Sequence, residues 1–143
     1  MVELKDGTRL VQTRAINNFI SYKYGFTPES AFKRYTGEQV LESLQGDFQK
    51  QLVRLFTDKD NAASIMDEIC DTHFPKWLES FDKNLNLQYQ AFICGDTLTL
   101  YDFEIGGFFL NTVYNPNSPH KEKWEAAMKK HSTMQINQYI ANF

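Results

Sequence analysis

Cys70 and His73 are the residues of this sequence best suited to metal chemistry, and Asp67 and Asp71 stand close beside them. Residues three apart share one face of a helix, so the thiolate and the imidazole would reach the same ion. A structural zinc site takes four ligands at closed spacing, and the sequence offers no second pair of this kind. We therefore predict no metal site and interpret the pair as a core cysteine beside a partly buried histidine.

Thr99 and Asp102 have the spacing of a capping box, in which the N-cap and N3 side chains each bond the other residue's backbone N–H group. Leu98 before the cap and Phe103 after it stand where the two halves of a hydrophobic staple belong. We assign these four residues to helix formation rather than to catalysis. Loss of such a cap costs about 1 kcal/mol.

A hairpin and a series of helices must position these residues. Residues 2–11 predict the β-hairpin, because Asp6-Gly7 is a turn pair in which both residues accept positive φ. Residues 84–91 read as a polar connection, and Gly106-Gly107 would let another backbone approach closely. Apolar residues at helical spacing predict helices over 13–24 with Thr13 as N-cap, 40–56, 62–85 with a kink at Pro75, 98–114 as a buried central helix, and two short segments around Trp124 and Ile136.

The hairpin is the least self-sufficient of these elements. A lone two-stranded hairpin is marginal in water, and its edges carry unpaired backbone groups. The rest of the sequence supplies no further strand pattern. The chain is therefore expected either to be part of a larger sheet or to have that sheet completed by a partner.

Composition narrows the class of protein. The 143 residues are 42% hydrophobic, include 12 Phe and carry a net charge of −3, which describes one folded domain without the basic surface of a nucleic-acid binder. Two cysteines are too few for a disulfide framework, and no apolar run is long enough to span a membrane. The start has no signal-peptide pattern. We expect a cytoplasmic protein and leave an organellar assembly open.

Three stretches resemble the cytosolic glutathione transferases. Residues 2–16 are similar to the end of that family's thioredoxin-like domain. They include Leu-Val-Gln-Thr-Arg-Ala-Ile, and this sequence is most similar to that of the alpha class. Residues 95–103 resemble the family's Gly-Asp-x-Leu-Ser/Thr-x-x-Asp element, and residues 74–79 resemble the kinked helix before it. The resemblance implies a mainly α fold, with 1–26 as a thioredoxin-like remnant and 27–143 as a C-terminal-type helical bundle.

The resemblance also implies binding roles. Gln12 and Thr13 would hold the γ-glutamyl end of glutathione, whose carboxylate suits a helix N-terminus, and the backbone at Val2 would face its cysteinyl part. Arg14 would lie at a subunit interface. Asp47 lies near the place where some classes put an acidic residue that reaches into the neighbouring subunit's site, and a solvated helix face is the alternative. Glutathione is thus the expected ligand, and no cofactor is predicted.

The family's catalytic Tyr, Ser or Cys belongs to a βαβ unit that would precede residue 1, so we predict no catalytic residue in this chain. Tyr22 and Tyr24 stand at the far end of the first helix from Thr13. We expect a non-catalytic structural or interaction subunit of a larger assembly, with a protein partner or a second copy covering the hairpin edge. One alternative is a fragment of an active transferase that conjugates glutathione to electrophiles. Another is a module that holds a ligand in an aromatic cleft.

Overall fold

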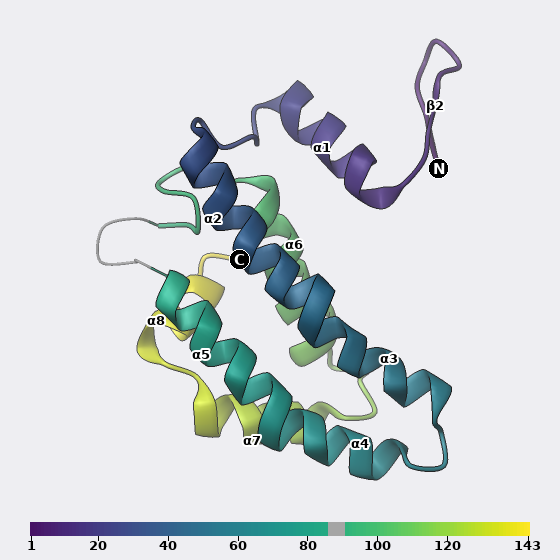
Figure 1. Cartoon of the computed structure of the whole chain (residues 1–143), viewed down its shortest axis with the longest axis vertical. Coiled ribbons are helices and arrows are strands. Elements are labelled where there is room, and N and C mark those ends of the chain that lie inside the picture. The colour runs from purple at the N-terminus through teal and green to yellow at the C-terminus, as the bar shows by residue number, and fades with distance from the viewer. Residues whose placement is uncertain (86–90) are drawn as a thin grey trace.

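The structure is a computed structural model that describes residues 1–85 and 91–143 (Figure 1). Most of the expected polar connection, 84–91, lies outside these residues. The fold is mainly helical with one small hairpin, as predicted. Its elements are β1 Val2–Glu3, β2 Arg9–Leu10, α1 Thr13–Tyr24, α2 Ala31–Glu42, η1 Ser43–Phe48, α3 Gln49–Thr57, α4 Ala62–Glu68, η2 Ile69–His73, α5 Phe74–Asn84, α6 Leu100–Phe108, η3 Phe109–Val113, α7 Lys121–His131 and α8 Met134–Ile140, where η marks a π-helical turn.

The hairpin pairs Val2 with Leu10 in antiparallel register. The backbone N–H of Leu4 donates to Thr8 O at 2.9 Å, and that of Gly7 donates to Leu4 O at 3.0 Å. Gly7 has a φ of 85°, while Asp6 is not among the residues with positive φ. The expectation of positive φ at both turn residues is therefore wrong. The turn is one residue longer than the predicted pair, and only its last position is left-handed.

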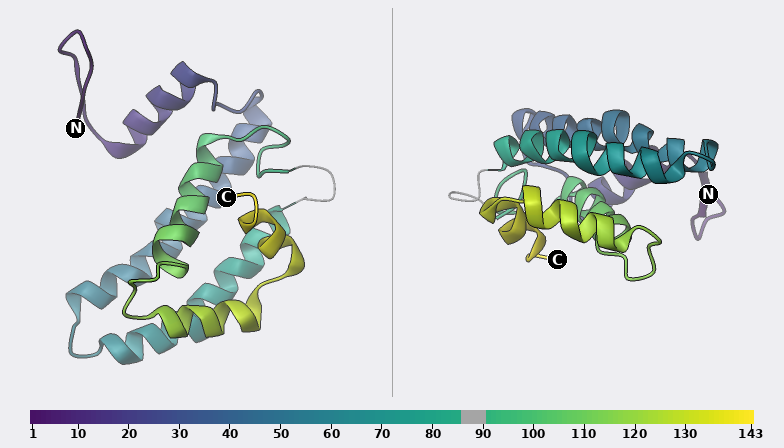
Figure 2. Two further views of the ribbon diagram at one scale, coloured as in Figure 1. Left: turned by 180° about the vertical axis from the view of Figure 1, so that it is seen from behind. Right: turned by 90° about the horizontal axis from the view of Figure 1, so that it is seen from below.

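Helix α1 extends with the hairpin as an arm beyond the bundle (Figures 1 and 2). It ends at Gly25, whose φ of 80° lets its N–H bond Ser21 O, as the sequence predicts. Ser21 is the one buried residue of the helix. Phe19 and Ile20, which belong to its expected apolar face, are each 39% exposed. The face of α1 that the sequence marks as apolar is thus only half covered by the described residues.

Three long helices form the bundle, and each contains a π-helical turn. The turn η1 joins α2 to α3, η2 joins α4 to α5, and η3 extends α6. Pro75 lies in the first turn of α5, directly after η2. The irregularity that the sequence predicts at this proline is a π-helical turn, and such turns are a recognised cause of helix bending.

The bundle is held together by an aromatic core. Phe48 lies 5.7 Å from both Trp77 and Phe108, measured between ring centroids. Trp77 stacks on Phe81 at 5.2 Å, and Phe74 meets Trp124 edge-on at 5.0 Å. These rings come from the three long helices and α7, so the core joins all of them.

Helix α6 runs through the centre of the bundle, as predicted, but it is not buried on every side. Phe103 and Leu110 are 47% and 48% exposed. A Cβ on Gly106 would lie 2.9 Å from the ring of Phe143, so the close neighbour at the glycine pair is a side chain and not a backbone. No helix within residues 1–85 and 91–143 is long and apolar enough to cross a membrane.

Candidate functional site

The strained backbone of Gln12 marks the start of α1. Its φ of 69° and ψ of 112° make it the one non-glycine residue with positive φ in the described part of the chain. Such conformations cost on the order of 1–3 kcal/mol and concentrate at binding and catalytic sites. The outlier therefore identifies this helix start as a candidate site.

Thr13 is the first residue of α1 rather than its N-cap, so the sequence prediction on this point is wrong. The Gln12 carbonyl already accepts from Ile16 N at 3.0 Å, which makes Gln12 the capping position. Its side chain makes no capping hydrogen bond. The first N–H groups of the helix thus receive no acceptor from the cap side chain, and this arrangement suits an incoming carboxylate.

Val2 lies at the same end of the hairpin as this helix start, because it pairs with Leu10, two residues before Gln12. Gln12 and Thr13 line one hollow, and Val2 is not among the residues of that hollow. Val2 and Thr13 are exposed.

Arg14 turns toward its own bundle. Its guanidinium forms ion pairs with Glu38 and Glu42 of α2, and the hydrogen bond to Glu42 raises the pKa of Arg14 further. Tyr101 of α6 donates its hydroxyl to Glu38 at 3.1 Å. Arg14 thus links the arm to the bundle, while its side chain stays 46% exposed.

Asp47 lies on η1, exposed, beside a hollow that also includes Trp77 and His73. It does not line the hollow formed by Gln12 and Thr13. Within this chain the structure therefore does not bring Asp47 to the start of α1.

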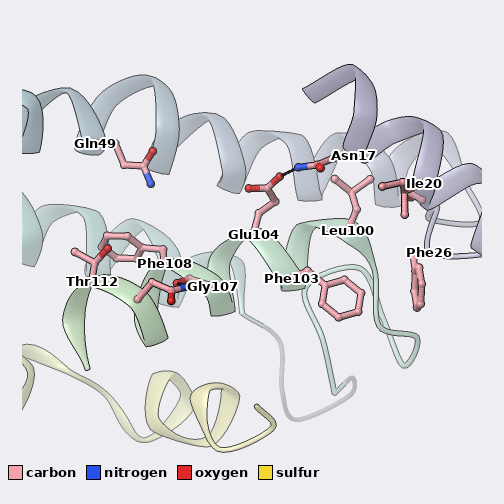
Figure 3. A pocket seen from close by; sticks show the side chains of 12 residues that line it. Asn17, Ile20, Phe26, Gln49, Leu100, Phe103, Glu104, Gly107, Phe108 and Thr112 are labelled. Carbon is pink, nitrogen blue, oxygen red and sulfur yellow. Dashed lines mark hydrogen bonds between the residues drawn. The ribbon is translucent and has the colours of Figure 1, made fainter. Parts of the chain in front are cut away.

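A hollow of about 650 Å³ lies between α1, α6 and α3, and we call it the arm cavity (Figure 3). Such a volume is typical of small-molecule sites. The arm cavity adjoins the hollow at the start of α1, because Asn17, Leu100 and Glu104 line both. Its lining residues are Asn17, Ile20, Ser21, Phe26, Gln49, Leu100, Phe103, Glu104, Gly107, Phe108, Asn111 and Thr112.

Glu104 is the one charged residue among these lining residues. Its carboxylate accepts from the Asn17 amide, drawn in Figure 3, and from Gln45 Nε2 at 3.1 Å. The sequence reasoning missed Glu104 because the central segment was interpreted as core. Glu104 is a second carboxylate in the apolar segment 98–114, besides the capping residue Asp102, and this could have indicated a role outside the core.

Asp102 is the buried centre of the start of α6, where it forms the capping box with Thr99. Its carboxylate accepts from Thr99 N at 2.9 Å, Ile93 N at 3.0 Å and the Tyr139 hydroxyl at 3.1 Å. Burial and this carboxylate raise the pKa of Tyr139, which keeps its hydroxyl a proton donor. These contacts serve the fold.

The expected staple partners of the capping box are only partly covered. Leu98 is half-buried, and the Phe103 ring meets Phe26 edge-on with centroids 5.1 Å apart. Phe103 therefore contributes to the wall of the arm cavity as well as standing at the staple position.

The two cysteines are unsuited to chemistry near neutral pH. Burial raises the pKa of both thiols, Cys70 and Cys94, to about 11. Cys70 Sγ lies 3.8 Å from Lys123 O, whereas His73 Nε2 lies 2.9 Å from Glu68. No group of three or more His, Cys, Asp or Glu residues that could hold a metal occurs among the described residues.

Comparison with known proteins identifies one family. The family model described as "Glutathione S-transferase, C-terminal domain" matches residues 46–143, more than half of the chain. No curated protein matches the sequence.

Proposed function

The chain belongs to the glutathione S-transferase family by its C-terminal domain, and we propose that it acts as a non-catalytic structural or interaction subunit of a larger assembly. The hairpin is the observation that carries this proposal. Each strand has two residues, and within residues 1–85 and 91–143 the strands pair only with each other. Such a hairpin gains stability when another polypeptide adds strands to its edge.

The apolar face of α1 supports the same proposal. Phe19 and Ile20 remain well exposed, and Arg14 and Asn17 attach the helix to the bundle by polar contacts. A partner or a second copy that docks against the arm would cover this face together with the hairpin edge. We place the assembly in the cytoplasm, and we assign glutathione, if it is bound, the role of a ligand.

The test combines an activity assay with a mass measurement. We expect the chain alone to give no turnover of glutathione with 1-chloro-2,4-dinitrobenzene. We also expect light scattering to give a molar mass larger than that of one chain. A variant without residues 1–11 is expected to have the mass of a monomer. Turnover by the chain alone, or a monomer with an intact hairpin that shows slow amide exchange, would contradict the proposal.

The start of α1 favours an alternative function. In this alternative, the chain is part of an active alpha-class transferase whose catalytic segment precedes these residues. Gln12 and Thr13 line one hollow, the Gln12 backbone is strained, and its side chain leaves the helix start uncapped. Calorimetric titration with reduced glutathione tests this alternative. Saturable binding that is lost in Gln12→Ala and Thr13→Ala, but kept in the exposed control Lys23→Ala, would support it.

A further inference from the structure

We propose that the arm cavity is a binding site for an organic cation, meaning an amine with an apolar body. The cavity joins aromatic and aliphatic walls to a single carboxylate. The apolar walls come from Ile20, Phe26, Leu100, Phe103 and Phe108, and the carboxylate is that of Glu104 (Figure 3). The arm cavity adjoins the hollow at the start of α1, since Glu104 lines both, and the proposed site requires that a partner of the arm leaves Ile20 uncovered.

Glu104 has charge and acceptor capacity to spare. An ionised carboxylate offers about four lone-pair positions, and neutral amides from Asn17 and Gln45 occupy two of them. Neither amide neutralises the charge. An ammonium group that enters the cavity can therefore donate to Glu104 without displacing its present partners.

The described residues supply no cation of their own to Glu104. No Lys, Arg or His is among the residues that line the cavity. Arg14 lines the neighbouring hollow together with Glu104, but its guanidinium forms ion pairs with Glu38 and Glu42. None of the ion pairs formed within residues 1–85 and 91–143 includes Glu104. A carboxylate in a partly apolar hollow is stabilised by a bound cation and repels a bound anion.

The walls select the rest of the ligand. Phe103 and Phe26 meet edge-on, and the free part of the Phe103 ring, with Ile20, leaves apolar surface open to solvent. An aromatic or aliphatic body would bury this surface, and the ring faces also attract a positive charge. Polar groups at the other end, Gln49 and Thr112, lie on the far side of Glu104 from Phe26 (Figure 3). The cavity thus fits an elongated ligand with a positive group near its middle or at one end.

The experiment uses the whole chain and three fluorescent probes. Each probe is a dansyl sulfonamide on a five-carbon chain, and the chain ends in an ammonium, a methyl or a carboxylate group. We expect saturable binding of the ammonium probe at pH 7.5, roughly tenfold tighter than that of the methyl probe, which is the scale of one charge-assisted hydrogen bond. The carboxylate probe should bind most weakly. Equal affinity for the ammonium and methyl probes, or no binding of the ammonium probe, would overturn the proposal.

Two variants assign the selectivity to Glu104. Glu104→Gln keeps the side-chain shape, removes the charge and replaces one of the two accepting oxygens by an NH2 group. It should lower the ammonium affinity to that of the methyl probe. Asn111→Lys, at an exposed position of the cavity rim, should have the same effect by supplying a competing ammonium group without altering Glu104. The matched control Glu125→Gln removes one charge from α7, outside the cavity, and should change nothing. Retention of the ammonium preference in Glu104→Gln would sink the proposal.

A third variant tests the apolar walls. Phe103→Ala removes a half-exposed ring and should weaken all three probes in parallel while leaving their order unchanged. Failure of the cation site and failure of the proposed function are distinguishable, because light scattering measures chain association independently of the probe titration. A cavity that is closed by another copy of the chain would appear as probe binding that weakens as protein concentration rises, and it would refute a free small-molecule site.

Discussion

The starts of α1 and α6 meet the same physical requirement in opposite ways. Every helix begins with backbone N–H groups that have no partner inside the helix. At α6, Thr99 and Asp102 are buried, and the Asp102 carboxylate collects donors from three segments of the chain. At α1, the capping residue Gln12 is exposed, its backbone is strained and its side chain makes no capping bond.

This difference separates a structural helix start from one suited to binding. Side chains that satisfy a buried helix start stabilise the fold and leave nothing for a ligand. A helix start left open at the surface contributes little stability and can receive an anion. Substitutions at α6 should therefore change the free energy of unfolding, and substitutions at α1 should mainly change local order and ligand binding.

Asp102→Ala should have the largest effect. Removal of the carboxylate leaves Ile93 N, Thr99 N and the Tyr139 hydroxyl as buried donors without their acceptor. We expect a loss of about 4 kcal/mol in the free energy of unfolding, measured by urea denaturation. The control Asp96→Ala removes an exposed carboxylate of the same loop and should cost less than about 1 kcal/mol. Similar losses in the two variants would remove the contrast between the helix starts.

Gly37→Ala extends the comparison to the packing of α6. A Cβ at Gly37 would lie 2.2 Å from the Tyr101 ring, so α2 or α6 would have to move. We expect destabilisation by about 2–3 kcal/mol, observed as a lower urea midpoint. Gly46→Ala, on the continuation of the same helix, meets only the flexible end of Glu42 and should be neutral or stabilising by up to about 1 kcal/mol. Equal effects at both glycines would show that the close approach does not exist in solution.

Gln12→Gly should have a smaller effect of opposite sign. Glycine relieves the positive φ, and the gain is reduced by the extra chain entropy that glycine loses on folding. We expect α1 to be stabilised by about 0.5–1 kcal/mol, measured by slower hydrogen exchange of its amides. Ala15→Gly in the same helix should act in the reverse direction, at about 1 kcal/mol. Faster exchange in Gln12→Gly would indicate an unstrained helix start.

Glu68→Gln should have the smallest effect, a loss of stability that is present above about pH 4.5 and disappears as the pH falls toward 2. Hydrogen bonds from Arg54 and His73 lower the pKa of Glu68 from 4.5 to about 2. A carboxyl whose pKa is lower in the folded state contributes stability above its unfolded pKa and loses it as the pH falls through the folded value. The fall in stability between about pH 4.5 and pH 2 should therefore be shallower in Glu68→Gln than in the original chain.

Urea midpoints taken across that pH range provide the measurement. Glu125→Gln, whose ion pair with Lys121 spans 3.7 Å, is the control and should leave the slope unchanged. An unchanged slope in Glu68→Gln would show that its hydrogen bonds to Arg54 and His73 do not form in solution.

Features set by near neighbours in the chain could be predicted from the sequence. The span of α1, its end at Gly25 and the spacing of three positions between Thr99 and Asp102 depend on hydrogen bonds and apolar periods within a few residues. The predicted start of the second helix at residue 40 is wrong, because α2 begins at Ala31. The prediction of Thr13 as an N-cap is wrong. A threonine at a helix start normally takes the capping position, and the backbone at Gln12 adopts a conformation that no residue type announces.

The remaining features depend on residues that are far apart in the sequence. The aromatic core joins rings from different helices, and the extra residue of each π-helical turn is hidden within the apolar pattern of the sequence. The Asn17 amide reaches Glu104 across 87 positions of the chain, and Asp102 reaches Tyr139 across 37. The sequence by itself determined which segments are helices and which family they resemble, because those patterns are local. Only the tertiary structure decided which carboxylate became buried and satisfied and which one faces a cavity, because that depends on what packs opposite each helix.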